Sequence, residues 1–279
     1  MKTPPKDLAK LALRIRELSE SLSVEQANQL SPPQVKQIHR TLIEAYRRLG
    51  HLTADLDPIK QPGFVFDPAN PNVVGRIVGI TMIAQPRISL TRVDRFYGSG
   101  IYAIYYRGDF SAYKRISKRE NPIYVGKADP AEASAKTAVE QGERLARRIN
   151  DHRKNITKAG RTLRLKDFDY RALVVQTGWQ SAAEEYLIDL FKPIWNSQIG
   201  ICYGFGKHGD DPGTRANLRS PWDTLHPGRD WAHRDPKMKD ARPRSRIVKD
   251  IQSHFAKHRP VKSIDEVLRN FLEEMRKAS

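Results

Sequence analysis

The chain has 279 residues, with 49 Lys and Arg against 32 Asp and Glu, and a formal net charge of +17. This charge favours a polyanionic partner, because Lys and Arg release the cations condensed on nucleic acid phosphates. A basic soluble protein without such a partner is the alternative, and charge does not separate DNA from RNA. The only cysteine, Cys202, excludes an internal disulfide. With no signal-peptide core and no apolar run of membrane-spanning length, we expect a soluble cytoplasmic protein.

Residues 1–55 are predicted to form a helical N-terminal extension. The first helix carries an apolar stripe with three- and four-residue steps, formed by Leu8, Leu11, Ile15, Leu18 and Leu22. A second helix is predicted to begin at Ser31, which forms a capping-box pattern with Gln34, and to end at Gly50. Its stripe is Val35, Ile38, Leu42, Ala45 and Leu49. Two such stripes predict a helical hairpin, and a dimerisation arm is the alternative interpretation.

Residues 60–232 are predicted to form a central α+β domain, in which a short antiparallel or mixed sheet is flanked by helices. The β-branched and aromatic content predicts strands at 98–106, 122–128 and 168–175. Helices are predicted at 73–85, 137–157 and 181–191.

Residues 233–279 are predicted to be a basic C-terminal extension. Its stretch 234–260 has few apolar residues and scattered prolines, which is typical of a mobile segment. A last helix is predicted to begin at Ser263, where a capping pattern extends to Glu266.

Two of the predicted strands carry a tyrosine close to a glycine, as GIY at 100–102 and YVG at 124–126. Taken alone, Tyr102 or Tyr124 is more typical of a half-buried ring with a hydrogen-bonded hydroxyl than of catalysis. The pair becomes informative only together with the residues that follow it.

The predicted basic helix places Arg148 and His152 one turn apart on nearly the same face. Arg can hold a phosphate through its planar donors, and His can accept or orient a proton. By itself, His152 is more typical of a structural histidine at the edge of the apolar stripe. Glu184 and Glu185 open the next helix, where a carboxylate either matches the helix dipole or holds a divalent metal ion. Asn196 could brace the site through hydrogen bonds to loop backbone.

In this order the motifs resemble those of GIY-YIG nucleases, including Arg-x-x-x-His, Glu-x-x-Leu-Ile and Pro-x-x-Asn. Aligning Leu187, Ile188 and Asn196 with the family's last segment selects Glu184 over Glu185. The segments GSGIYAIYYRGDFSAY, NPIYVGKA, GFGKHG, DPGTR and RSPWDTLHPGRDWA, within about residues 60–232, resemble the Eco29kI family of type II restriction endonucleases. The chain departs from the pattern at Val125, which replaces isoleucine, in the long loop between the tyrosine motifs, and in its terminal extensions.

The resemblance implies Mg²⁺-dependent hydrolysis of a short palindrome in double-stranded DNA, such as CCGCGG, by a homodimer in the prokaryotic cytosol. It implies no small-molecule cofactor, and it implies a cognate methyltransferase that completes a restriction–modification system. Tyr102 would be the general base or would orient the water, with His152 assisting its deprotonation, and Glu184 would hold the metal ion. The phosphate would be clamped by Arg148 and positioned by Tyr124, while Asn196 would support the scaffold.

Further cations are predicted to contact DNA. Backbone contacts are assigned to Lys127, Arg144, Arg147, Arg153, Lys154 and Lys158. Base reading is assigned to Arg215, Asn217, Arg219 and Arg229, for which phosphate contact or a solvated loop charge is the alternative. The competing functions are a GIY-YIG nuclease of repair or mobile-element type and a catalytically inactive DNA-binding protein.

Overall fold

The computed structural model describes residues 5–21, 23, 30–57, 59, 67–206, 218–233 and 236–277. The chain divides into two compact units, Met1–Phe64 and Val65–Ser279. Among the described helices, none is long and apolar enough to cross a membrane.

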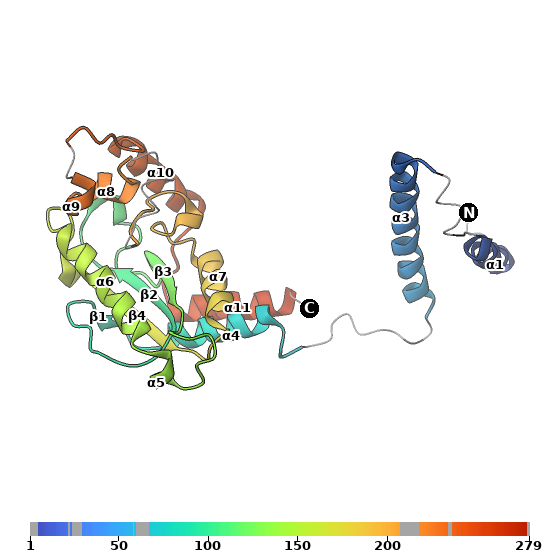
Figure 1. The fold of residues 1–279 in the computed structure, drawn as a ribbon, viewed down its shortest axis with the longest axis horizontal. Coiled ribbons are helices and arrows are strands. Elements are labelled where there is room, and N and C mark those ends of the chain that lie inside the picture. Colours follow the sequence, from blue (N-terminus) through green and yellow to red (C-terminus); the bar gives the residue numbers. More distant parts are fainter. Residues whose placement is uncertain are drawn as a thin grey trace. The chain divides into compact units, whose positions relative to one another are not determined.

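The first unit contains helices α1 (Pro5–Ser21) and α3 (Pro32–Leu56), shown in blue in Figure 1. The predicted capping box is confirmed, since each of the Ser31 and Gln34 side chains accepts from the other residue's backbone amide at the start of α3. The prediction that Gly50 ends this helix is wrong, because α3 continues to Leu56. A glycine inside a helix costs only about 1 kcal/mol, and the apolar stripe continues beyond it through Leu52 and Leu56.

The apolar stripes of these two helices are exposed. No residue of α3 is buried, and Leu11, Ile15 and Leu18 of α1 are all exposed. Both predicted helices are therefore present, but the described residues do not bury the two stripes against each other as the predicted hairpin requires.

The second unit contains a four-stranded sheet in the order β1-β4-β2-β3, with every neighbouring pair antiparallel. The strands are β1 (Ile88–Ser89), β2 (Gly100–Tyr106), β3 (Tyr124–Ala128) and β4 (Phe168–Val174). Every residue of β2 is buried, because this strand lies inside the sheet and is covered on both faces. The predicted α+β class is confirmed.

Successive side chains of β2 point to opposite faces of the sheet. On one face, Tyr102, Ile104 and Tyr106 join a core with helix α6 (Arg144–Lys158). On the other face, Ile101, Ala103 and Tyr105 join a second core. The helices that cover this second face are α4 (Pro71–Ala84), α7 (Gln180–Phe191) and α11 (Ile264–Lys277), as Figure 1 shows. The sheet is therefore sandwiched between helical layers.

The basic helix predicted at 137–157 is two helices, α5 (Ala138–Gln141) and α6. They are separated at Gly142, which has a φ of +73° that favours glycine. The backbone of Gly98, just before β2, donates to the Gly142 carbonyl and accepts from the Leu145 amide. This break therefore ties the start of α6 to the start of the central strand.

The prediction that residues 234–260 are a mobile stretch is wrong for Arg244–Lys257, which form helix α10. Few apolar residues suffice here, because Ile247, Ile251 and Phe255 recur at four-residue steps and are all buried. Helix α10 contacts α8 (Pro221–Leu225) and the 3-10 turn η1 (Ser111–Tyr113). The predicted last helix is present as α11, which begins directly after Ser263.

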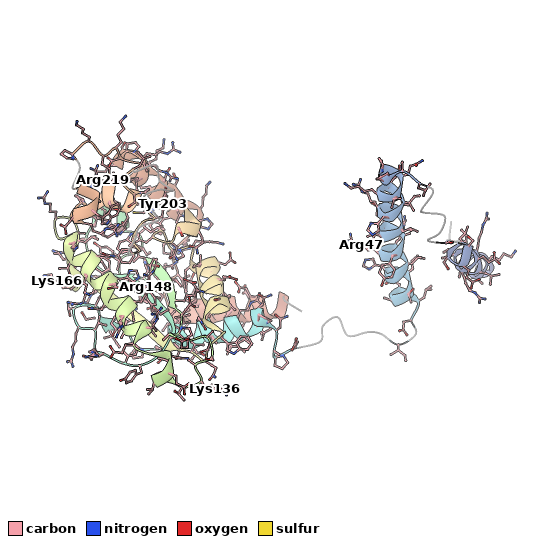
Figure 2. All side chains as sticks on the ribbon, viewed as in Figure 1. Arg47, Lys136, Arg148, Lys166, Tyr203 and Arg219 are labelled. Atoms are coloured by element: carbon pink, nitrogen blue, oxygen red, sulfur yellow. The ribbon has the colours of Figure 1, made fainter. Side chains whose placement is uncertain are left out.

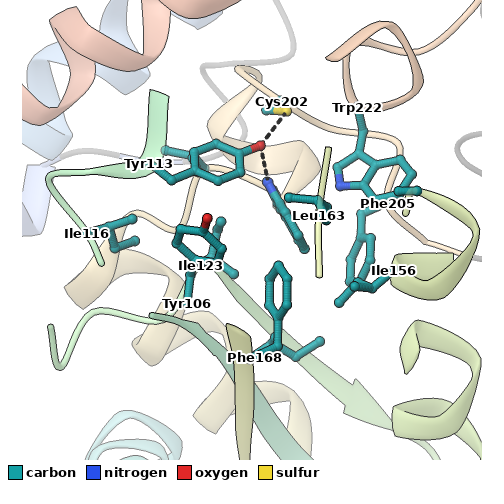
Figure 3. Close-up of a cluster of buried hydrophobic side chains, with 14 of the residues drawn as sticks. Tyr106, Tyr113, Ile116, Ile123, Ile156, Leu163, Phe168, Cys202, Phe205 and Trp222 are labelled. Atoms are coloured by element: carbon teal, nitrogen blue, oxygen red, sulfur yellow. Dashed lines mark hydrogen bonds between the residues drawn. The ribbon is translucent and has the colours of Figure 1, made fainter. Parts of the chain in front are cut away.

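An aromatic cluster fills the core beside α8 and α10 (Figure 3). The Tyr113 hydroxyl accepts a hydrogen bond from Trp195 Nε1 at 2.9 Å and lies 3.6 Å from the Cys202 Sγ. Phe168 and Trp222 pack in the same cluster. Cys202 is thus a buried thiol, and burial raises its pKa to about 12. The remaining short helical elements are η2 (Leu165–Asp167), η3 (Ser197–Ile199) and α9 (Asp230–His233).

Candidate active site

The pairing of β2 with β3 brings the two tyrosine motifs together. Tyr102 lies opposite Gly126 in the sheet register, and the Tyr102 and Tyr124 ring centroids are 6.1 Å apart. A Cβ atom at position 126 would lie 2.5 Å from the Tyr102 hydroxyl oxygen, too close for any side chain. The glycine of the second motif therefore makes room for the tyrosine of the first.

Helix α6 presents His152 to this pair of tyrosines. The His152 Nε2 lies 2.6 Å from the Tyr102 hydroxyl oxygen, and both side chains are fully buried. The His152 ring packs against Tyr124 with centroids 4.9 Å apart and stacks on Phe205 at 4.4 Å, with an interplanar angle of 17°. Arg148 lies one turn earlier on α6 (Figure 2). The sequence-predicted Arg, His and two Tyr residues are thus assembled at one place.

Burial sets the protonation of this cluster. It lowers the pKa of His152 well below the usual range, and the positive charges of Arg148 and Arg229 act in the same direction. Burial raises the pKa of Tyr102 well above the usual range, while Arg148 opposes that rise. At neutral pH, His152 is therefore uncharged and lies beside a protonated tyrosine. If Tyr102 loses its proton during catalysis, as the resemblance implies, the histidine beside it is a neutral group that could accept that proton and not a cationic one.

A cleft of about 580 Å³ opens beside the cluster. Its wall is formed by Tyr124, Lys127, Ala128, Asp129, Arg144, Arg147, Arg148, Asp151 and Glu184. Tyr102 and His152 do not reach this wall and lie behind it. Tyr124 is thus the tyrosine that borders the cleft, and the buried Tyr102 and His152 rings both pack near it, with centroids 6.1 Å and 4.9 Å away.

Glu184 reaches the cleft from the second turn of α7. Burial raises the pKa of its carboxyl to about 7, although the charge and the backbone N–H of Lys127 act to lower it. Asp129 on the same wall contributes to the rise. Glu185 is exposed and lines a separate small cleft with Arg76. The structure thus separates the two adjacent glutamates and brings only Glu184 to the site.

The described residues contain no group of three or more His, Cys, Asp or Glu side chains placed to hold a metal ion. Magnesium does not require one, because it commonly keeps several waters and binds one or two carboxylates together with substrate phosphates. The cleft wall offers such oxygen donors in Glu184, Asp129 and Asp151. These side chains fit a Mg²⁺ ion that DNA phosphate would help to hold.

Asn196 is buried and supports the edge of β3. Its Oδ1 accepts from the Val125 amide at 3.0 Å, and its Nδ2 donates to the Val125 carbonyl at 2.8 Å. The side chain thus bonds to strand backbone, where the sequence had suggested loop backbone. By fixing the residue next to Tyr124, it holds the cleft wall in place.

Of the six cations predicted to contact the DNA backbone, three line the cleft, while Arg153 donates to Asn150 and Lys158 to Asp230. Lys127, Arg144 and Arg147 line it, and Lys154 is exposed on α6. The first two also have partners within the fold, since Lys127 Nζ donates to Ser181 Oγ at 2.7 Å and Arg144 Nε donates to the Asp129 carbonyl. The wall of the cleft therefore carries both basic side chains and carboxylates.

The structure contradicts the base-reading role predicted for Arg229. Its side chain is 2% exposed and forms a bidentate ion pair with Asp223, with both N–O distances at 2.7 Å. The same guanidinium donates to the carbonyls of Gly204, Phe205 and Gly206. Its donors are therefore committed to the fold.

Arg219 also serves the fold. It donates to Asp240 Oδ1 at 2.7 Å and to the Ala232 carbonyl at 2.9 Å. The predicted roles of Arg215 and Asn217 lie outside the described residues. Among the described residues, none of the predicted base readers is left free for that role.

Phe205 is a site residue that sequence reasoning missed. Its ring stacks on His152 and meets Tyr124 edge-on at 5.2 Å, while its carbonyl accepts from Asn155 of α6. The only sequence signal was its place between two glycines in the segment GFG. That segment was associated with the family resemblance and not with the site.

A small antiparallel sheet that joins tyrosines from two paired strands to Arg and His on a helix, with Glu on the next helix, defines a GIY-YIG nuclease domain. The family model of the Eco29kI GIY-YIG domain matches residues 94–255, more than half of the chain. The chain therefore belongs to the Eco29kI family of GIY-YIG restriction endonucleases. No curated protein matches the chain in sequence.

Proposed function

We propose that this protein is a Mg²⁺-dependent type II restriction endonuclease that cleaves a short palindrome in double-stranded DNA. CCGCGG is the first candidate site because it is cut by some enzymes of the family. The observation that carries the proposal is the cleft, where Tyr124, Arg148 and Glu184 share one wall with basic residues. Behind this wall lies the bonded pair of Tyr102 and His152.

The residues divide the work of phosphodiester hydrolysis. Arg148 binds the non-bridging oxygens of the scissile phosphate through its planar donors. Tyr124, at the cleft wall, positions that phosphate and the attacking water. The water's proton passes to the Tyr124 hydroxyl as that group passes its own proton to Tyr102, with which it interacts. Neutral His152 then accepts the proton that Tyr102 releases across the 2.6 Å contact. General base assistance of this kind is typically worth about 10²- to 10⁴-fold in rate.

Glu184 gives the site its acidic group. Its carboxylate, aided by Asp129 or Asp151, would hold one Mg²⁺ ion against the bound phosphate. When bound, the ion supplies positive charge that stabilises the non-bridging and leaving oxygens. Because the pKa of Glu184 is raised to about 7, loss of its proton accompanies metal binding at neutral pH.

Cleavage of both strands of a palindrome requires two such clefts related by two-fold symmetry. Since the described part of each chain supplies one, a homodimer on DNA forms part of this proposal. A prokaryotic cytosolic location follows from the same function, as does a methyltransferase that protects the host site. That enzyme would act through the DNA and need not contact this chain.

The test is digestion of unmethylated plasmid and phage DNA by the purified protein in Mg²⁺, with Glu184→Ala as the control. Discrete fragments that disappear with the variant, and whose sequenced ends share one palindrome, support the proposal. Nicks or smears that depend on Glu184 would assign a nuclease of repair or mobile-element type instead. Specific binding without any cleavage would assign a DNA-binding protein that has lost the chemistry.

A further inference from the structure

Among the residues that the structure describes, hydrogen bonding holds His152 at only one of its two ring nitrogens. Its Nε2 lies 2.6 Å from the Tyr102 hydroxyl oxygen, whereas its buried Nδ1 has no hydrogen-bond partner in the described part of the chain. A histidine that transfers protons is usually oriented by a carbonyl or carboxylate bonded to its second nitrogen. In this part of the chain, contacts other than a hydrogen bond at Nδ1 must therefore orient the imidazole.

The Phe205 ring makes the closest aromatic contact of His152 among the described residues. The two rings are stacked, with centroids 4.4 Å apart and an interplanar angle of 17°. The rings of Tyr102 and Tyr124 also contact His152, but they meet it at angles of 38° and 58°. The χ2 torsion of a histidine has only broad intrinsic preferences, so neighbouring groups decide it. Because turning the imidazole about χ2 would drive its edge into the parallel Phe205 ring, the stack restricts that rotation.

Phe205 is itself fixed relative to helix α6. Its side chain is fully buried and packs against Trp222, with ring centroids 5.4 Å apart (Figure 3). Its carbonyl oxygen accepts from Asn155 Nδ2 at 3.1 Å and from Arg229 Nη1 at 3.4 Å. Asn155 lies three residues after His152 on the same helix. The backbone that carries the Phe205 ring is therefore bonded to the helix that carries the imidazole.

The buried ion pair of Arg229 and Asp223 also holds the segment 204–206. Arg229 donates to all three carbonyls of this segment, and Asp223 fixes the guanidinium through two N–O contacts of 2.7 Å. A Cβ atom at Gly206 would lie 3.8 Å from Arg148 Nη2, so the end of the segment lies beside the arginine of the cleft wall. One braced segment therefore borders both candidate catalytic side chains of α6.

We propose that Phe205 is a positioning residue, whose stacked ring keeps His152 Nε2 directed at the Tyr102 hydroxyl. The ring has the orienting role that a bonded carboxylate has for many catalytic histidines. This inference rests on the proposed function, in which His152 accepts the proton that Tyr102 releases. Without the ring, the imidazole can turn about χ2, and fewer molecules hold the relay contact at any moment. A displacement of about 1 Å in an active site can lower the rate about 10²-fold.

Phe168 provides the matched control. It is also fully buried, and it belongs to the same aromatic core as Phe205. Its ring packs against Tyr106 and Trp195, at centroid distances of 5.1 Å and 5.7 Å. Exchange of either phenylalanine for leucine removes the same number of atoms from this core, so both variants lose packing. Phe205→Leu additionally removes the ring that is stacked on His152.

The first test is the rate of plasmid cleavage in Mg²⁺ under single-turnover conditions, with DNA affinity measured separately without Mg²⁺. Phe205→Leu is expected to lower the cleavage rate about 10- to 100-fold while its DNA affinity stays within a few-fold of the wild type. Phe168→Leu is expected to cleave at a rate within a few-fold of the wild type. Equal losses of rate in the two variants would overturn the inference, because loss of core packing would then explain both. A wild-type rate for Phe205→Leu would overturn it as well.

The second test is the NMR signal of the His152 ring protons, which does not depend on activity. The ring current of a phenyl group stacked at 4.4 Å shifts these signals upfield. The signals, assigned by their absence from His152→Gln, are expected upfield in the wild type and in Phe168→Leu, and less so in Phe205→Leu. Unshifted signals in the wild type would overturn the inference. The expected shifts in a protein that never cleaves DNA would support the stacking contact and refute the proposed function alone.

Discussion

Glu184→Gln is expected to stabilise the nuclease unit while abolishing its activity. The carboxylate is held in a partly desolvated cleft that raises its pKa from 4.5 to about 7. The folded state therefore binds the Glu184 proton more tightly than the unfolded state does. Consequently, this group's contribution to stability declines as pH rises from about 4.5 to about 7, and the destabilisation is complete above that range.

The pKa difference sets the size of the effect. A rise from 4.5 to about 7 corresponds to about 3 kcal/mol of destabilisation above pH 7. Partial exposure of Glu184 and screening by solvent reduce the expected gain for Glu184→Gln to about 1–2 kcal/mol. Near pH 5 the gain is expected to be far smaller, because most of the wild-type carboxyl groups are then protonated.

The assay is urea unfolding followed by tryptophan fluorescence, near pH 5 and near pH 8, with EDTA present. All four tryptophans, Trp179, Trp195, Trp222 and Trp231, lie in the second unit, so the signal reports the nuclease unit alone. Glu185→Gln is the control, because Glu185 is exposed and its loss should change stability by less than about 0.5 kcal/mol. A Glu184→Gln protein that is no more stable than the wild type near pH 8 would refute the reasoning.

Three further outcomes are expected. Tyr102→Phe should lower the DNA cleavage rate by about 10²- to 10⁴-fold. Tyr106→Phe, a buried change on the same strand, should cleave DNA at a rate within a few-fold of the wild type. Equal losses of rate in the two variants would contradict the proton relay. Arg229→Ala should lower the free energy of unfolding, measured by urea titration, by about 3–5 kcal/mol, because the change leaves the buried Asp223 carboxylate without its ion-pair partner. Loss of a solvated, base-reading arginine would not have this effect. EDTA should abolish cleavage. Because protons compete with Mg²⁺ for the Glu184 carboxylate, the apparent Mg²⁺ affinity in cleavage assays should fall about tenfold per pH unit below about 7. An affinity that does not change with pH would argue against Glu184 as the metal ligand.

Local patterns were sufficient to predict three of the four strands, whereas the family resemblance was needed to assign the candidate site residues. The β-branched and aromatic content predicted β2, β3 and β4, and the four-residue spacing placed Arg148 and His152 on one side of α6. These features depend only on neighbours in the sequence. The choice between Glu184 and Glu185 required the family resemblance, because one residue's difference on a helix becomes decisive only where tertiary packing buries one side chain.

Features that depend on distant segments could not be predicted. Arg229 resembled a DNA-reading residue because its partners, Asp223 and the carbonyls of residues 204–206, come together only in the folded chain. The composition of residues 234–260 suggested mobility, since it averages over many charged residues. The three residues Ile247, Ile251 and Phe255 nevertheless form a face that the aromatic core can cover. Residue type and composition alone were therefore insufficient to predict the roles of Arg229 and of residues 234–260.

The space at Gly126 links the two halves of the family's signature. Because a Cβ there would displace the Tyr102 hydroxyl, the first tyrosine and the second glycine can change only together. The absence of a side chain at Gly126 thus leaves room for the Tyr102 hydroxyl, which lies 2.6 Å from the Nε2 of His152 on α6. The two halves of the motif, separate in the sequence, therefore form one packing unit in the folded sheet.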